Sequence, residues 1–187
     1  MRVISGNFKG KKLLEPKDIK TRPLKDLTKE SIFNIIKHSN KFKLSIENSI
    51  VLDLFSGVGS FGLECISRGA KHVTFVENYE GVLPILKKNL FNTSNSENYE
   101  IVEKNIIDGI TLKKKTRKFD IVFLDPPYKD KNLRKILLNI FNEKITFKNT
   151  IFIIHRHKKE KDLYPENFKI LDEKIYGISK IIFGILK

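Results

Sequence analysis

Two short apolar runs constrain the fold of this 187-residue chain more than any other feature. Residues 50–55 (IVLDLF) and 119–124 (FDIVFL) are rich in β-branched and aromatic residues, and they have the length of strands buried on both faces. Each run is followed by a segment of helical periodicity. Strands that alternate with helices form parallel sheets, and ligands bind at the carboxyl edge of such sheets.

The rest of the chain continues this alternation and adds a distinct end. Helices are predicted at residues 27–38, from the turn at 56–62 to about 68, at 81–92, and on the face marked by Leu133, Ile136, Leu137, Ile140 and Phe141, with further strands at 72–76, 99–103 and 151–154. Asp26 is the expected cap of the first helix. Residues 168–176 and 178–186, divided by Gly177, predict an antiparallel hairpin. Five βα alternations and an antiparallel pair predict a three-layer α/β sandwich.

A glycine-rich turn follows the first of the two strands. Gly57, Gly59 and Gly62 have the spacing G-x-G-x-x-G, and Glu77 ends the next strand twenty residues beyond Gly57. This pattern matches the dinucleotide fingerprint, in which glycines let a backbone approach a ligand and a carboxylate binds ribose hydroxyls. Taken alone, the pattern favours NAD.

Asp53 favours a different ligand. It lies within the strand just before the turn, where a carboxylate would repel a pyrophosphate but attract an ammonium group. The chain also has little length for a separate substrate domain. S-adenosylmethionine carries a ribose for Glu77 and an ammonium group for Asp53, so it fits both carboxylates. The cofactor-binding candidates are Asp53, Phe55, Ser56, Gly57, Gly59, Glu77, Asn78, Asn105, Ile106 and Asp108.

The sequence Asp125-Pro126-Pro127-Tyr128 follows the second strand. The two prolines end the strand and hold Asp125 and Tyr128 on a stiff turn at its carboxyl end. The alternative is an ordinary surface turn, because Asp-Pro commonly opens turns. Asp108, or the backbone at 105–106, could bind an adenine amino group, with a helix cap as the alternative.

Charge and composition indicate the partner and the compartment. The formal net charge is +14 and the pI about 9.7, which favours a polyanion, RNA or DNA first. Only six of the 36 basic residues are arginines, so codon bias is an alternative source of the charge. The single cysteine, Cys65, and the lack of a long apolar run indicate a cytoplasmic protein that does not enter a membrane. His155 and His157 lack acidic or cysteine neighbours at metal spacing, so no metal is expected.

Residues 2–14 alternate around Gly6 and Gly10 and predict a small β-hairpin. Its basic residues Arg2, Lys9, Lys11 and Lys12 surround Phe8, a combination that suits looped or single-stranded RNA. The alternative is a solvated edge hairpin.

With these residues in place, the chain resembles the class I S-adenosylmethionine-dependent methyltransferases. It is most similar to the RsmD family, bacterial guanine-N2 methyltransferases of small-subunit (16S) ribosomal RNA. The likeness covers nearly the whole chain and rests on residues 2–6 (RVISG), 10–13 (GKKL), 21–23 (TRP) with Asp26, Glu30, Phe33 and Asn34, 52–57 (LDLFSG), 62–64 (GLE), 67–70 (SRGA) and 125–128 (DPPY). The chain departs from the family pattern at Leu27, usually arginine, at Asn78 and Tyr79, where another acid is common, and at His155, often an acid.

The resemblance implies a Rossmann-like class I methyltransferase sandwich, with a mostly parallel seven-stranded sheet. Residues 1–42 would be an N-terminal RNA-binding hairpin with a covering helix, and residues 43–187 the catalytic domain that binds S-adenosylmethionine. It implies RNA contacts at Arg2, Lys9, Lys11, Lys12 and Arg22, catalytic roles for Asp125, Pro126, Pro127 and Tyr128, and a monomer that acts on ribosomal RNA within a small-subunit particle. Open alternatives are an amino methyltransferase for another RNA or DNA base, and a non-catalytic RNA-binding assembly factor.

Overall fold

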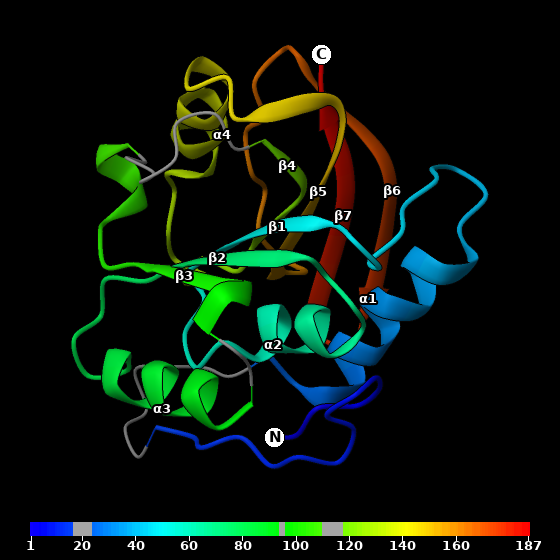
Figure 1. Cartoon of the computed structure of the whole chain (residues 1–187). Coiled ribbons are helices and arrows are strands. Elements are labelled where there is room, and N and C mark those ends of the chain that lie inside the picture. Colours follow the sequence, from blue (N-terminus) through cyan, green and yellow to red (C-terminus); the bar gives the residue numbers. More distant parts are fainter. Residues whose placement is uncertain (17–23, 94–95, 110–117) are drawn as a thin grey trace.

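A seven-stranded sheet forms the centre of the computed structural model, which describes residues 1–16, 24–93, 96–109 and 118–187 (Figure 1). Its strands are β1 (Ile50–Leu54), β2 (His72–Val76), β3 (Tyr99–Val102), β4 (Phe119–Leu124), β5 (Thr146–His157), β6 (Phe168–Tyr176) and β7 (Ser179–Leu186). The order is β3-β2-β1-β4-β5-β7-β6. β1 to β5 are parallel, and β7 runs antiparallel between β5 and β6. The predicted fold class is therefore confirmed.

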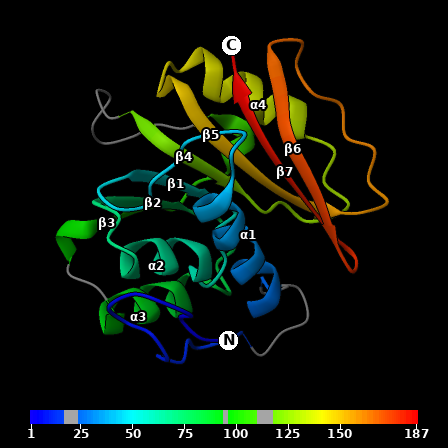
Figure 2. The same ribbon diagram turned by 90° about the vertical axis from the view of Figure 1, so that its right-hand side faces the viewer.

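Helices cover the two faces of the sheet unequally. The helices are α1 (Asp26–His38), α2 (Ser60–Ser67), α3 (Leu83–Thr93) and α4 (Leu133–Asn142), with short 3-10 turns η1 (Ser96–Asn98) and η2 (Ile106–Asp108). α1, α2 and α3 lie on one face and α4 on the other (Figures 1 and 2). Alternation along β1 supplies both layers, because Val51 joins the core cluster of α1–α3 while Leu52 joins that of α4. The result is three layers.

The N-terminal segment folds back on itself with less regular structure than a hairpin. An isolated antiparallel bridge pairs Arg2 with Lys12, and backbone hydrogen bonds join Val3 to Lys11 and Leu13 to Met1 across the loop. The loop also packs on α2 through its own backbone. The Glu64 carboxylate accepts hydrogen bonds from the Ile4 and Ser5 N–H groups at 2.7 and 3.0 Å. The buried Lys29 ammonium lies 3.6 Å from that carboxylate and donates to the Arg2 carbonyl at 2.7 Å. Burial lowers the pKa of Lys29, and the Glu64 charge opposes this.

Val3 and Leu13 of this loop, with Ile32 and Phe33 of α1, lie in the same core cluster as residues of the sheet. The boundary near residue 42 stays a prediction.

Several local expectations need correction. α1 begins at Asp26 and its N-cap is Lys25, which makes no side-chain cap hydrogen bond, so Asp26 lies within the first turn. Phe141 is 42% exposed and does not share the buried face of α4. β5 is twelve residues long and leads into β6 without a helix, so the number of βα alternations was overestimated.

The burial of Cys65 and the length of the helices can be compared with the expectations from the sequence. Cys65 is fully buried, and burial raises the pKa of its thiol, as expected for a small core residue. Within the described ranges, the helices are all too short or too polar to cross a bilayer.

Candidate active site

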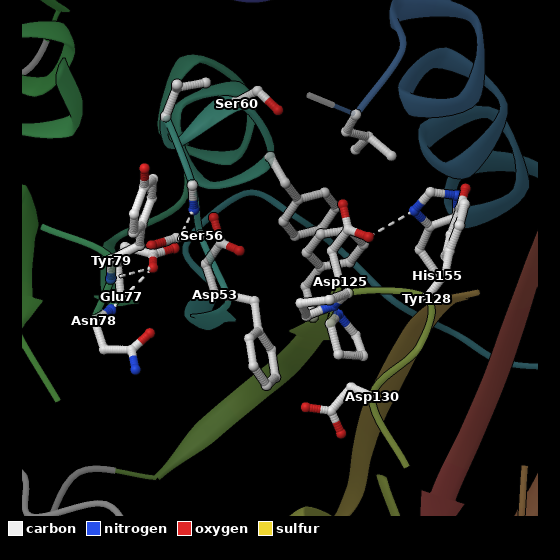
Figure 3. Close-up of a pocket in the computed structure, with 18 of the residues that line it drawn as sticks. Asp53, Ser56, Ser60, Glu77, Asn78, Tyr79, Asp125, Tyr128, Asp130 and His155 are labelled. Atoms are coloured by element: carbon white, nitrogen blue, oxygen red, sulfur yellow. Dashed lines mark hydrogen bonds and ion pairs between the residues drawn. The ribbon is translucent and has the colours of Figure 1, made fainter. Parts of the chain in front are cut away.

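A cavity of about 530 Å³ opens at the carboxyl edge of the parallel strands. It lies where β1, β2, β4 and β5 end, which is the edge at which open α/β sheets bind ligands. Among the residues that line it are Leu24, Thr28, Asp53, Phe55, Ser56, Gly57, Glu77, Asn78, Tyr79, Asn105, Ile107, Asp125, Pro126, Pro127, Tyr128, His155 and Ser179. Figure 3 shows Asp53 and Glu77 on one side of this cavity and Asp125, Tyr128 and His155 on the other.

The glycine-rich turn lies beside the Glu77 carboxylate, which binds its backbone. Phe55 and Gly57 have φ of 58° and 55°, and Gly59, the N-cap of α2, has φ of 83°. This run of left-handed backbone bends the chain sharply at the end of β1 and costs strain at the non-glycine Phe55. The Glu77 carboxylate accepts the Gly57 N–H at 2.8 Å. Its other oxygen accepts the N–H groups of Asn78 and Tyr79, at 2.9 and 2.8 Å, so Glu77 joins the turn to the backbone that follows β2.

Asp53 lies deeper, at the back of the cavity. It is 1% exposed; its Oδ2 accepts the Gly62 N–H at 2.9 Å, while the buried Oδ1 has no hydrogen-bond partner. Burial raises the pKa of Asp53 well above its ordinary value, and the neighbouring charges of Asp125 and Glu77 raise it further. A cationic group in the cavity would satisfy Oδ1 and stabilise the carboxylate.

The Asp125-Pro126-Pro127-Tyr128 turn is held from beneath by a fully buried arginine. Arg156 of β5 donates to the Pro127 carbonyl at 3.1 Å and to the Asp130 carbonyl at 2.7 Å. Its charge is paired with Asp162 at 2.8 Å. All four residues of the turn line the cavity.

Asp125 is also held from the side by a histidine. Its Oδ1 lies 2.7 Å from His155 Nδ1 (Figure 3). His155 Nε2 lies 2.9 Å from Ser179 Oγ. The Tyr128 ring packs edge-on against the rings of His155 and His157, with centroids 5.9 and 5.1 Å apart. Asp125 Oδ2 is therefore the carboxylate oxygen left for a ligand.

The remaining predicted cofactor-binding residues do not all line the cavity. Asn105 lines the cavity, and its side chain caps η2 by accepting the Ile107 N–H at 3.0 Å. Ile106 is buried in the core, and its neighbour Ile107 lines the cavity instead. Gly59 borders the core, where an added Cβ would meet Leu86 at 2.7 Å. Asp108 ends η2 and its side chain is outside the description.

The four RNA-binding candidates that the structure describes lie apart from the cavity lining. Arg2, Lys9, Lys11 and Lys12 are exposed on the N-terminal loop, and the Lys11 ammonium donates to the Asn92 carbonyl of α3. Arg22 lies outside the described residues.

His155, Ser179, Thr28 and Arg156 were not among the predicted site residues. His155 had a usable signal: it ends an apolar strand next to the one that ends at Asp125, and the carboxyl ends of parallel neighbours meet. The register pairs Leu124 with Ile154, which brings the following residues, Asp125 and His155, together. Ser179 comes from an antiparallel strand far along the chain, and only the sheet order could indicate it.

The residues that line the cavity fit S-adenosylmethionine. Asp53 Oδ1 is a buried acceptor that needs a donor, and an added Cβ at Gly57 would meet no atom within 4 Å, so the turn leaves open space for a ligand. No group of three His, Cys, Asp or Glu side chains suited to a metal ion occurs among the residues described.

Comparison with known proteins agrees with this geometry. The family model "Conserved hypothetical protein 95" matches residues 1–185. Ribosomal RNA small subunit methyltransferase D of Haemophilus influenzae is 36% identical over 95% of this chain and 90% of its own length. The protein of that name from Buchnera aphidicola is 34% identical over 92% of this chain and 86% of its own. The structure of yhhF from Escherichia coli superposes with a TM-score of 0.82, at 26% identity, over 100% of this chain and 98% of that one. The chain therefore belongs to the Conserved hypothetical protein 95 family, the RsmD family of S-adenosylmethionine-dependent methyltransferases.

Proposed function

We propose that this protein transfers a methyl group from S-adenosylmethionine to the exocyclic N2 amine of a guanine in small-subunit (16S) ribosomal RNA, acting as a monomer on a small-subunit particle. The observation that carries the proposal is the placement of Asp125, with one free carboxylate oxygen, in the same cavity as Asp53 and Glu77. An amine acceptor and a cofactor site thus share one space.

The chemistry follows from the weakness of the nucleophile. The lone pair of an exocyclic amine is delocalised into the ring of the base. Hydrogen bonds from its two N–H groups to Asp125 Oδ2 and to the Pro126 carbonyl would localise the lone pair on nitrogen and direct it outward. When bound, S-adenosylmethionine supplies the methyl group. Positioning contributes much of the rate, and the Asp125 charge stabilises the cation that develops on nitrogen.

The two ends of the cofactor have matching groups in the cavity. Asp53 Oδ1 would accept from the ammonium group, and Glu77 would accept from the ribose hydroxyls beside the backbone of Gly57. Phe55 and Ile107 supply apolar surface for the adenine. Glu77 accepts three backbone N–H groups, so its carboxylate is held in a fixed position.

The substrate class rests on the charge, the turn and the relatives. Tyr128 is partly exposed at the cavity and would stack on a base that is unpaired or flipped out. The net charge of +14 favours a nucleic acid partner. The relatives from Haemophilus influenzae and Buchnera aphidicola are named as methyltransferases of small-subunit ribosomal RNA.

Three rival functions have specific counterarguments. A DNA amino methyltransferase is less favoured, because the relatives from Haemophilus influenzae and Buchnera aphidicola are named for ribosomal RNA. Methylation of glutamine side chains typically uses asparagine where this chain has Asp125. A non-catalytic assembly factor would not need a carboxylate at this position.

In the decisive experiment, the protein is incubated with radiolabelled S-adenosylmethionine and with small-subunit particles. The particles come from cells that lack this protein. Label should enter the 16S RNA and should run as N2-methylguanosine after nuclease digestion. Free 16S RNA, duplex DNA and ribosomal protein serve as parallel substrates. Label in adenosine, in DNA or in protein would refute the proposal, as would the absence of labelled methylguanosine.

A further inference from the structure

We infer that His155 is a positioning residue that fixes the Asp125 carboxylate with Oδ2 turned toward the substrate amine, and that Ser179 fixes the tautomer of His155. The inference rests on the proposed function, because it assigns a role in the same reaction. It concerns a side chain at the end of β5, the strand that lies next to β4 in the sheet.

Both ring nitrogens of His155 are engaged. Nδ1 lies 2.7 Å from Asp125 Oδ1 and Nε2 lies 2.9 Å from Ser179 Oγ. The side chain of His155 is 7% exposed and that of Asp125 18%. A buried imidazole with two short contacts has one orientation, so the carboxylate that it holds has one orientation too.

The direction of the two hydrogen bonds follows from the ionised carboxylate. An ionised carboxylate only accepts, so Nδ1–H of His155 must donate to Asp125 Oδ1. Nε2 of a neutral imidazole is then an acceptor, and the Ser179 hydroxyl must donate to it. The chain of donors runs from Ser179 through His155 to Asp125 and reaches one carboxylate oxygen only. The other oxygen is left for the amine.

The cavity needs such a restraint because it gathers like charges. The Asp125 charge raises the pKa of Asp53, so the two carboxylates repel each other. This repulsion favours movement of the Asp125 side chain away from Asp53. The 2.7 Å contact with His155 Nδ1 opposes that movement. Tyr128, edge-on to the His155 ring at 5.9 Å, limits the movement of the ring itself.

Two substitutions distinguish the hydrogen-bond donor of His155 from the volume of its ring. In His155→Asn the amide Nδ2 stands one bond beyond Cγ, as Nδ1 does, so it can still donate to Asp125. His155→Leu has an apolar side chain that fills part of the space of the ring but has no hydrogen-bond donor. His38→Asn, at the exposed last residue of α1, is the matched control. For each protein we would measure kcat, KM for the RNA substrate, Kd for S-adenosylmethionine and the urea midpoint.

We expect kcat to fall about 100-fold in His155→Leu and less than about 10-fold in His155→Asn, because misplacing a reacting group typically costs this much. KM and Kd should stay close to the parent values, and His38→Asn should resemble the parent in all four measurements. The urea midpoint of His155→Leu should fall, because the buried Ser179 hydroxyl loses its partner. Equal losses of kcat in Asn and Leu, or a fall in kcat accompanied by a matching rise in Kd, would overturn the positioning role.

A spectroscopic measurement keeps the inference testable without turnover. Long-range ¹H–¹⁵N correlation spectra, assigned by comparison with His155→Asn, should show His155 as the Nδ1–H tautomer. Ser179→Ala should shift it toward a mixture with Nε2–H. An Nε2–H tautomer in the parent protein would overturn the inference even if methyl transfer occurs. An Nδ1–H tautomer in a protein without transfer to RNA would instead refute the proposed function.

Discussion

The guanidinium of Arg156 donates to the main-chain carbonyl of Pro127 at 3.1 Å, and this bond joins a fully buried side chain of β5 to the turn that follows β4. The same guanidinium donates to the Asp130 carbonyl and pairs with Asp162. The Pro127 carbonyl also accepts the Asp130 N–H at 2.8 Å, so Arg156 adds a second donor to a carbonyl that already closes the turn. Arg156 therefore stabilises the turn that carries Asp125.

Arg156→Met should reduce the free energy of unfolding by about 3–5 kcal/mol, because it leaves the Asp162 carboxylate buried and unpaired. Urea denaturation followed by circular dichroism measures this. Arg134→Met, on the exposed face of α4, is the matched control and should change stability by less than about 0.5 kcal/mol. Similar losses in the two variants would show that Arg156 has no special structural role.

Most of the fold could be predicted because its signals are local. The apolar run of β4, the glycine turn before α2 and the split of the last hairpin at Gly177 each depend on residues adjacent in sequence. Asp53, Glu77 and Asp125 could be placed together because each lies at or near the end of a parallel strand.

The contacts around Asp125 could not be predicted in the same way. His155 and Arg156 look alike in sequence, as polar residues at the end of an apolar strand. Whether such a side chain faces the cavity or the layer beneath the turn depends on register and twist. The N-terminal loop was harder still, because its backbone bonds with Glu64 and Ser67 on α2 as well as across the loop itself.

Asp125→Asn should abolish methyl transfer while leaving cofactor affinity unchanged. The amide keeps the shape of the side chain but loses the charge that faces the developing cation. The reaction is followed with radiolabelled cofactor and the affinity by calorimetry. Glu143→Gln, at the exposed C-cap of α4, is the control for loss of one negative charge. A parallel loss of binding in Asp125→Asn would mean that this carboxylate contacts the cofactor.

Asp53→Asn should stabilise the ligand-free protein at neutral pH. Because the folded pKa of Asp53 lies above its ordinary value of 3.8, the stability that this group contributes is fully present below the unfolded pKa. It is lost as pH rises through the folded pKa. The gain from the substitution should therefore increase as pH rises above about 4, which urea denaturation at several pH values measures.

The same substitution should weaken the binding of S-adenosylmethionine, because a neutral amide does not attract an ammonium group. 5′-Methylthioadenosine lacks the amino-acid end and serves as the control ligand, with affinity expected to be equal for both proteins. Equal weakening of both ligands would place Asp53 away from the ammonium group.

Replacing Lys9, Lys11 and Lys12 by glutamine should weaken RNA binding and flatten its salt dependence. Each phosphate contact contributes a slope of about 0.7–0.9 in log K against log salt. Filter binding over a salt series gives the slope. The charge-matched control replaces Lys144, Lys148 and Lys169, which are also exposed. Identical slopes in the two triple variants would indicate that the lysines act through overall charge alone.

Gly6 and Gly10 provide a matched pair for testing how the N-terminal loop is attached. Both have positive φ, 81° and 86°, so alanine at either position costs about 1–2 kcal/mol of backbone strain. At Gly6 the added Cβ would stand 1.8 Å from the Ser67 carbonyl oxygen, whereas at Gly10 it would meet nothing within 4 Å. Gly6→Ala must therefore lift the loop from α2.

Lifting the loop breaks the hydrogen bonds from the Asn7 and Phe8 N–H groups to Ser67, at 2.8 and 2.9 Å. Gly6→Ala should consequently lose more unfolding free energy than Gly10→Ala in urea denaturation. It should also lose affinity for RNA in filter binding, because the loop that carries Lys9 and Lys11 would no longer be held against α2. Equal destabilisation by the two substitutions would mean that the strain alone matters and that the contact with Ser67 yields easily.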